Sequence, residues 1–220
     1  MVGKTFTRAL CCLFVLKLAC GTLLAQSRPH TIHVSPSGRV VPGALPPANI
    51  TIFSNLGPTP TDLYYSANGW VVTGPADVTF GEQWVAVPFI AKQNSHAFRL
   101  QVAVGYLSGT NKFTLGLYSD SGGTVGTALI NTTVTNAPPF GVCCATVTKN
   151  LPPPGIALTA GTQYWVVARS TPTGADDFEG AWAFSNLGVA FNDAEAGWTT
   201  FSVGDFGAGQ PAAAVLGTTP

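Results

Sequence analysis

The chain has 220 residues, of which 46% are hydrophobic and only 9% are charged. Ten basic residues balance ten acidic residues, so the formal net charge at pH 7 is zero. This balance argues against the basic patch of a nucleic-acid-binding domain and the polybasic segment of a membrane-surface protein. The length and the apolar content suit a single domain with a substantial core.

The first 25 residues have the pattern of a secretory signal peptide. Lys4 and Arg8 give a positive start, an apolar run follows, and Ala25 offers a small residue for cleavage. We therefore expect residues 1–25 to be removed and the mature protein to be secreted. One alternative is a transmembrane anchor, for which the stretch is short. Another is lipidation at Cys20, whose surroundings resemble a bacterial lipoprotein box.

Removal of this segment changes both the charge and the cysteine count. Seven basic and ten acidic residues remain, and Cys143 and Cys144 are the two cysteines left of five. Two adjacent cysteines cannot build a zinc cluster or a multi-disulfide scaffold. Residues 26–48 then come first, and their prolines and lack of alternation predict a linker or a loosely docked arm.

From about residue 49 the chain alternates short apolar stretches with turns, which predicts one all-β domain over residues 49–220. The clearest strand is 97–107, and after a turn a second alternating stretch, 112–117, predicts a hairpin. The positions expected to face the core are Phe98, Leu100, Val102, Val104, Phe113, Leu115 and Leu117.

Further strands are predicted where apolar stretches are bounded by Gly, Pro, Asn and Asp. They cover residues 63–72, 84–90, 127–134, 163–170, 181–191, 199–203 and 213–216. About nine or ten strands of this kind predict an antiparallel β-sandwich with a jelly-roll-like arrangement.

A five-residue sequence, FSNLG, occurs twice, at residues 53–57 and 184–188. The residues on either side differ between the two copies, so an internal structural repeat is not expected. We interpret the match as a coincidence or as two similar strand ends.

The two remaining cysteines, Cys143 and Cys144, are adjacent, and secretion would place them in an oxidising compartment. With no third cysteine in the mature chain, we predict a vicinal disulfide in the turn that follows the proline-rich residues 136–141. The alternative is two free thiols, because neighbouring side chains in a regular strand point to opposite faces.

Three acidic residues gather in one predicted loop: Asp176, Asp177 and Glu179. Solvated acids that keep a weakly charged protein soluble are the first interpretation. A structural calcium site is the second, and a glycosidase carboxylate pair is the third. His96 has no neighbouring serine motif that indicates a triad, so no catalytic residue is assigned, and no cofactor is expected apart from such a calcium ion.

Five tryptophans are many for one domain. Trp165 lies in an alternating stretch and is expected to pack in the core. Trp182 and Trp198 lie beside glycine-rich acidic loops, and we expect this pair to be exposed, where flat rings can stack on a ligand such as a sugar.

Three segments in fixed order carry a resemblance: LYSDSGG at 117–123, the cysteine pair, and LTAGTQYW at 158–165. Together they resemble bacterial secreted modules of the choice-of-anchor R type, over residues 50–218. The resemblance implies an extracellular β-sandwich whose biochemical role is unknown, and it supplies no catalytic residues. Such modules often carry a C-terminal sorting tail, and residues 217–220 show none of its features, so we expect release.

These features predict a secreted, non-enzymatic β-sandwich module for extracellular binding or matrix structure, with a carbohydrate as the ligand class. The alternatives are a polysaccharide hydrolase acting through the acidic loop and a purely architectural surface protein. The expected partner is an extracellular polysaccharide or matrix, with no nucleic acid and no membrane after signal cleavage. The oligomeric state is left open.

Overall fold

The computed structural model describes residues 30–39, 50–171, 174–187, 195–197, 201–203 and 209–220. The predicted signal peptide and much of the predicted linker lie outside these ranges. Within them the protein is all-β, and its strand pairs are antiparallel apart from one short parallel pair. The described part contains seventeen strands, more than the nine or ten expected, because several have only two to four residues. None of it is a helix long and apolar enough to cross a bilayer.

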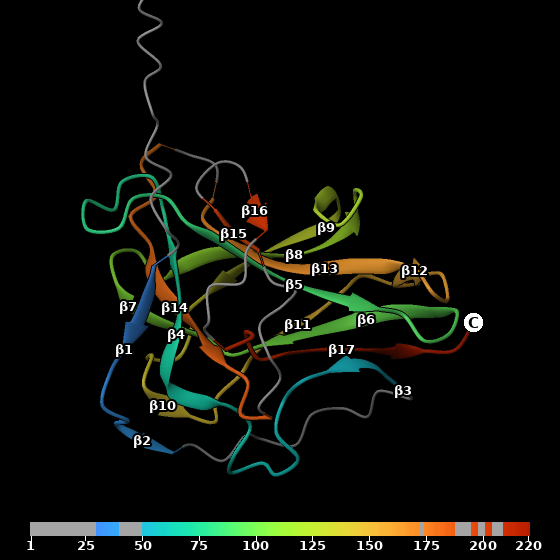
Figure 1. Cartoon of the computed structure of the whole chain (residues 1–220), viewed down its shortest axis with the longest axis horizontal. Helices are drawn as coiled ribbons and strands as arrows, with labels where there is room; N and C mark the ends of the chain where they lie inside the picture. Colours follow the sequence, from blue (N-terminus) through green and yellow to red (C-terminus); the bar gives the residue numbers. More distant parts are fainter. Residues whose placement is uncertain (1–29, 40–49, 172–173, 188–194, 198–200, 204–208) are drawn as a thin grey trace, which may run out of the picture.

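A four-stranded sheet lies at the left of Figure 1. Its strands, in order, are β1 (Thr31–His33), β4 (Tyr65–Thr73), β14 (Glu179–Phe184) and β7 (Val104–Ser108). β1 comes from the segment predicted as a linker or arm, and it pairs along β4 with Thr31 opposite Trp70. Part of that segment is therefore an edge strand of this sheet.

A five-stranded sheet contains the C-terminal strand. Its strands, in order, are β11 (Val147–Asn150), β6 (Ser95–Val102), β17 (Ala213–Thr218) and β3 (Ile50–Ser54), with β12 (Ile156–Leu158) also paired to β6. His96, which the sequence left without a catalytic partner, lies inside β6 and is paired with both β12 and β17.

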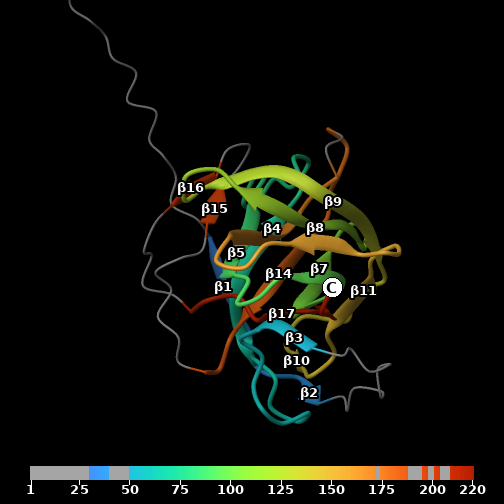
Figure 2. The same cartoon turned by 90° about the vertical axis from the view of Figure 1, so that its right-hand side faces the viewer.

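The largest sheet has six strands, seen at the upper right of Figure 1. In order they are β16 (Phe201–Val203), β15 (Glu195–Gly197), β5 (Trp84–Ile90), β13 (Gln163–Arg169), β8 (Lys112–Asp120) and β9 (Val125–Thr135). A separate parallel pair joins β2 (Gly38–Arg39) to β10 (Val142–Cys143). Figure 2 shows the same sheets from the side.

One apolar core cluster takes side chains from all three large sheets. Fully buried members include Val72, Trp182, Leu100, Val215, Leu115 and Val166. Of the seven positions predicted to face the core, six are buried, and Phe98 is only partly buried. The alternating pattern therefore identified six of the seven core positions, but in β6 Ala97 and Arg99, expected to face outward, are buried as well.

The predicted continuous strand 97–107 is wrong in one respect, because it is divided at Ala103 into β6 and β7, which belong to different sheets. The amide of Ala103 donates to the carbonyl of Ala212 (3.1 Å), and its carbonyl accepts from the amide of Ala183 (3.0 Å). Small side chains at these three positions allow the backbones to meet closely, and the chain passes from one sheet to the next there.

The predicted hairpin is also wrong, because β7 and β8 do not pair with each other. β7 pairs with β14, whereas β8 pairs with β9 and β13. The connecting loop is held by the acidic segment: the amide of Thr110 donates to Asp177 Oδ1 (2.9 Å). Gly109 has a φ of 77°, and a Cβ there would lie 1.9 Å from the carbonyl oxygen of Asp177. A tight hairpin turn is replaced by a loop packed on another segment.

Candidate functional site

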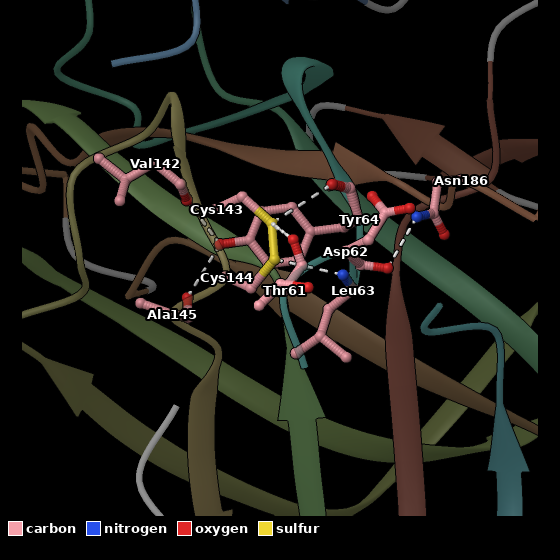
Figure 3. The surroundings of a disulfide bond; sticks show 9 residues. All are labelled: Thr61, Asp62, Leu63, Tyr64, Val142, Cys143, Cys144, Ala145 and Asn186. Carbon is pink, nitrogen blue, oxygen red and sulfur yellow. Dashed lines mark hydrogen bonds between the residues drawn. A yellow bond between two sulfur atoms is a disulfide. The ribbon is translucent and has the colours of Figure 1, made fainter. Parts of the chain in front are cut away.

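Cys143 and Cys144 form a disulfide, which confirms the predicted vicinal pairing. The bridge lies where β10 ends and a turn begins, and the peptide bond between the two residues is cis. Both residues are buried. The disulfide is therefore part of a packed corner of the molecule (Figure 3).

The disulfide packs against the chain just before β4. The amide of Leu63 donates to Cys144 Sγ at 3.2 Å. Cys143 Sγ lies 3.9 Å from the carbonyl oxygen of Thr61 and 3.7 Å from that of Tyr64. A disulfide sulfur carries no hydrogen, so these two approaches are packing contacts rather than hydrogen bonds. The bridge thus supports the backbone of residues 61–64.

Tyr64 ties the same segment to the cysteine turn from the other direction. Its hydroxyl lies 2.7 Å from the carbonyl oxygen of Val142 and 3.2 Å from that of Ala145, and it donates its one proton to this carbonyl pair, as Figure 3 shows. Burial of the side chain raises the pKa of Tyr64 to about 12, because the phenolate loses its hydration. The phenol therefore stays neutral and acts as a fixed donor.

The backbone at Asp62 is held on both sides. Its amide donates to the carbonyl of Thr59 (3.0 Å), and its carbonyl accepts from the side-chain amide of Asn186 (2.8 Å). The amide of Gly57 donates to the carbonyl of Leu63 (2.8 Å), one residue further along. The loop therefore has little freedom, although the Asp62 side chain itself is exposed.

The two FSNLG copies meet at this corner, at the ends of β3 and β14. In each copy the serine hydroxyl accepts from the leucine amide two residues later, at 3.2 Å: Ser54 from Leu56, and Ser185 from Leu187. The Ser185 hydroxyl also donates to the carbonyl of Asn55 (2.6 Å). Of the two interpretations offered from sequence, similar strand ends fits the structure.

A pocket of about 320 Å³ opens beside the disulfide. It is lined by Pro36, Gly38, Asp62, Tyr64, Tyr65, Ser66 and Cys143. The volume is at the small end of the range of about 300–1,000 Å³ that is usual for ligand sites. The pocket thus combines an aromatic wall, a disulfide and one carboxylate.

The N-terminal arm forms one side of this pocket. The amide of Val34 donates to the carbonyl of Ala67 (2.7 Å), and the amide of Ser37 donates to the carbonyl of Gly141 (2.8 Å). Gly38 is then paired with Val142 across β2 and β10. Tyr65, which also lines the pocket, is 49% exposed, at the start of a strand that is otherwise mostly buried.

The three acidic residues singled out from the sequence are each engaged in holding the fold. Asp176 is 8% exposed and accepts from the amides of Thr171 (2.5 Å) and Phe178 (3.0 Å). Hydrogen bonds from the side chain and backbone of Thr110 lower the pKa of the Asp177 carboxyl. Glu179 accepts from the hydroxyl of Ser108.

These carboxylates do not converge. In the part of the chain that the structure describes, no three His, Cys, Asp or Glu side chains lie close enough together to hold a metal ion. The structure therefore does not gather Asp176, Asp177 and Glu179 into the calcium site considered above.

The expected exposure of Trp182 is wrong. Its side chain is 0% exposed, and its indole nitrogen donates to the carbonyl of Ala212 (2.8 Å). The residue lies in β14, between two other strands, where the sheet and the core enclose it. Trp198 lies outside the described residues. Trp165 is buried as predicted, and its indole nitrogen donates a hydrogen bond to Asp120 Oδ1 (2.9 Å).

Sequence reasoning missed the pocket residues Asp62 and Tyr65. The signal that could have found one of them is the pair Tyr64-Tyr65 at a strand start, because adjacent side chains there face opposite sides and both cannot enter the core. Nothing local in the sequence brings Asp62 to the cysteine pair, since the contact joins residues about 80 positions apart.

No protein-family model matches this chain, and the search of curated proteins gives no match either.

Proposed function

We propose that the protein is exported and acts outside the cell as a non-enzymatic module that binds an extracellular polysaccharide. The proposal includes a sandwich arrangement of the antiparallel sheets, jelly-roll-like in order, and kinship with the choice-of-anchor modules. The observation that carries it is the pocket beside the Cys143–Cys144 disulfide, with its half-exposed Tyr65 and the carboxylate of Asp62.

The positions and hydrogen bonds of the carboxylates favour binding over catalysis. A glycosidase needs two carboxyl groups that flank one bond. Asp62 is the acidic residue lining the pocket, and Asp176, Asp177 and Glu179 accept hydrogen bonds from loops and strand ends elsewhere. One carboxylate beside an aromatic ring suits the recognition of hydroxyl groups.

Export and the vicinal disulfide support each other in this proposal. A disulfide persists in an oxidising compartment and is rare in the cytosol. The pattern of Lys4, Arg8 and Ala25 at the N-terminus supplies the route out of the cell. A preformed pocket on a rigid β framework then keeps the ordering cost of binding low.

The full-length sequence is expressed in a secreting host, and the protein recovered from the medium is tested against insoluble and soluble polysaccharides, with and without calcium. We expect a mature N-terminus at Gln26, retention on a neutral polysaccharide in both conditions, and no release of reducing ends. A lipid-modified N-terminus at Cys20 would contradict free secretion. Newly formed reducing ends would identify a hydrolase, and failure to bind any polymer would reject the binding function.

A further inference from the structure

We propose that the pocket beside the disulfide takes one uncharged sugar ring of a longer glycan. The apolar face of the ring packs between Tyr65 and Cys143 Sγ, and its hydroxyl groups donate to the carboxylate of Asp62. This inference rests on the proposed binding function and adds the location of the site and the class of sugar.

The size and lining of the pocket fit a small, two-faced ligand. Its volume of about 320 Å³ suits one ring system rather than a flat polymer surface. Tyr65, Tyr64 and Cys143 supply apolar surface, while Asp62 and Ser66 supply polar groups. A sugar ring has this same division, with C–H groups on its face and hydroxyls around its edge.

The apolar side of the site is formed by the Tyr65 ring and the disulfide sulfur. The ring is 49% exposed, which leaves aromatic surface available for stacking. Cys143 lines the pocket and its Sγ carries no hydrogen, so the sulfur surface that a ligand reaches is soft and polarizable. Such a surface favours C–H groups.

The polar side of the site argues against an anionic ligand. Asp62 is the charged residue among those lining the pocket, and an ionised carboxylate accepts hydrogen bonds but cannot donate them. Within the described residues no group donates a hydrogen bond to this carboxylate, so its oxygens remain available to ligand hydroxyls. A uronic acid would be repelled, and a neutral hexose would not.

The backbone that carries the site is fixed before a ligand arrives. The backbone of Asp62 is held by Thr59 and Asn186, and Tyr64 is anchored to the cysteine turn. Because these groups are ordered in the free protein, binding does not have to order them. Hydrogen bonds to a charged acceptor are also stronger than neutral ones.

The experiment measures binding by isothermal titration calorimetry on protein expressed from the full-length sequence. The probes are neutral hexose oligosaccharides, galacturonic acid oligomers and glucosamine oligomers. We expect a neutral oligosaccharide to bind the unmodified protein, and Tyr65→Ala and Asp62→Asn each to weaken it at least about tenfold. Tyr65→Phe should retain binding, because the ring is kept and only the hydroxyl is lost.

The matched control is Ile90→Ala, an exposed apolar residue on β5, which should leave the affinity unchanged. Neutral-sugar binding that survives both Tyr65→Ala and Asp62→Asn would place the ligand elsewhere and overturn this inference, while the binding function stands. Binding of the acidic or the cationic oligomers alone would overturn the uncharged-sugar assignment in the same way. No binding to any oligosaccharide, together with no retention on any polysaccharide, would overturn both proposals.

Discussion

The disulfide corner and the acidic segment 176–179 both consist of loops that hold strands from different sheets, but they use their polar groups in opposite ways. In the acidic segment, Asp176 accepts from the amide of Thr171 and Asp177 accepts from the amide of Thr110, both in neighbouring loops. At the disulfide corner, backbone groups and the Tyr64 hydroxyl hold the loop, while the Asp62 carboxylate stays exposed.

This difference separates acids that maintain the fold from an acid that can serve a ligand. A carboxylate whose oxygens already accept amide hydrogens gains little from a ligand, and its removal leaves those amides without a partner. A carboxylate on a fixed backbone with open oxygens costs the fold little and can be offered to a ligand. Clustering of acids in the sequence does not distinguish the two cases.

The largest expected effect is on the acidic segment. Asp176→Ala removes a buried acceptor of the Thr171 and Phe178 amides, so the free energy of unfolding should fall by about 3 kcal/mol. Urea denaturation followed by circular dichroism measures the change. Asp62→Ala is the matched control, and as an exposed residue it should change stability by no more than about 0.5 kcal/mol. Equal losses of unfolding free energy in the two variants would show that the two regions do not differ in how their acids support the fold.

The second prediction concerns Tyr64, whose pKa is raised to about 12 by burial. In the unfolded chain a tyrosine titrates near 10, so the folded chain holds this proton more tightly. The resulting stability is complete below pH 10 and is lost as the pH rises through 12, by about 2.7 kcal/mol in total. Unfolding measured from pH 9 to 12 should show this fall, and Tyr64→Phe should remove it. A Tyr64→Phe protein with the same pH dependence would assign the fall to other groups.

Much of the β character could be predicted from the sequence, because the local alternation of apolar residues reports which side of a strand is buried. Leu100, Leu115 and Leu117 are fully buried as that pattern predicts. Local alternation does not show which strands pair with each other. Pairing of β7 with β14 joins residues about 75 positions apart, and no local turn signal encodes it.

At the candidate site, too, local features could be predicted from the sequence and features that depend on distant segments could not. The Cys143–Cys144 bridge could be predicted because the two residues are adjacent and the other three cysteines all lie within the first 20 residues. The burial of Trp182 and the role of Asp62 could not, since both depend on which distant strands and loops enclose them. Composition near a residue, such as glycine-rich acidic flanks, is a poor guide to its exposure.

The smallest expected effect on stability comes from the disulfide itself, although it forms the centre of the site. The ring that it closes contains two neighbouring residues, so the loss of loop-closure entropy in the unfolded chain is small, at about 1 kcal/mol or less. Reduction of the bridge, which keeps both sulfur atoms in place, should therefore leave the urea concentration of half-unfolding nearly unchanged.

The local consequences should be larger than the global one, because Cys144 Sγ accepts the amide hydrogen of Leu63 and Cys143 lines the pocket. In the reduced protein, amide hydrogen exchange should accelerate at Leu63 and around the cysteine turn, while core strands such as β13 keep their protection. The affinity for the neutral oligosaccharide should fall in the same protein.

Freshly secreted, unmodified protein should offer no thiol to an alkylating reagent after unfolding, and two alkylated thiols there would contradict the bridge. Uniformly faster exchange across β13 would instead show that the disulfide stabilises the whole fold, and the contrast between a stabilising acidic segment and a ligand-facing disulfide corner would fail.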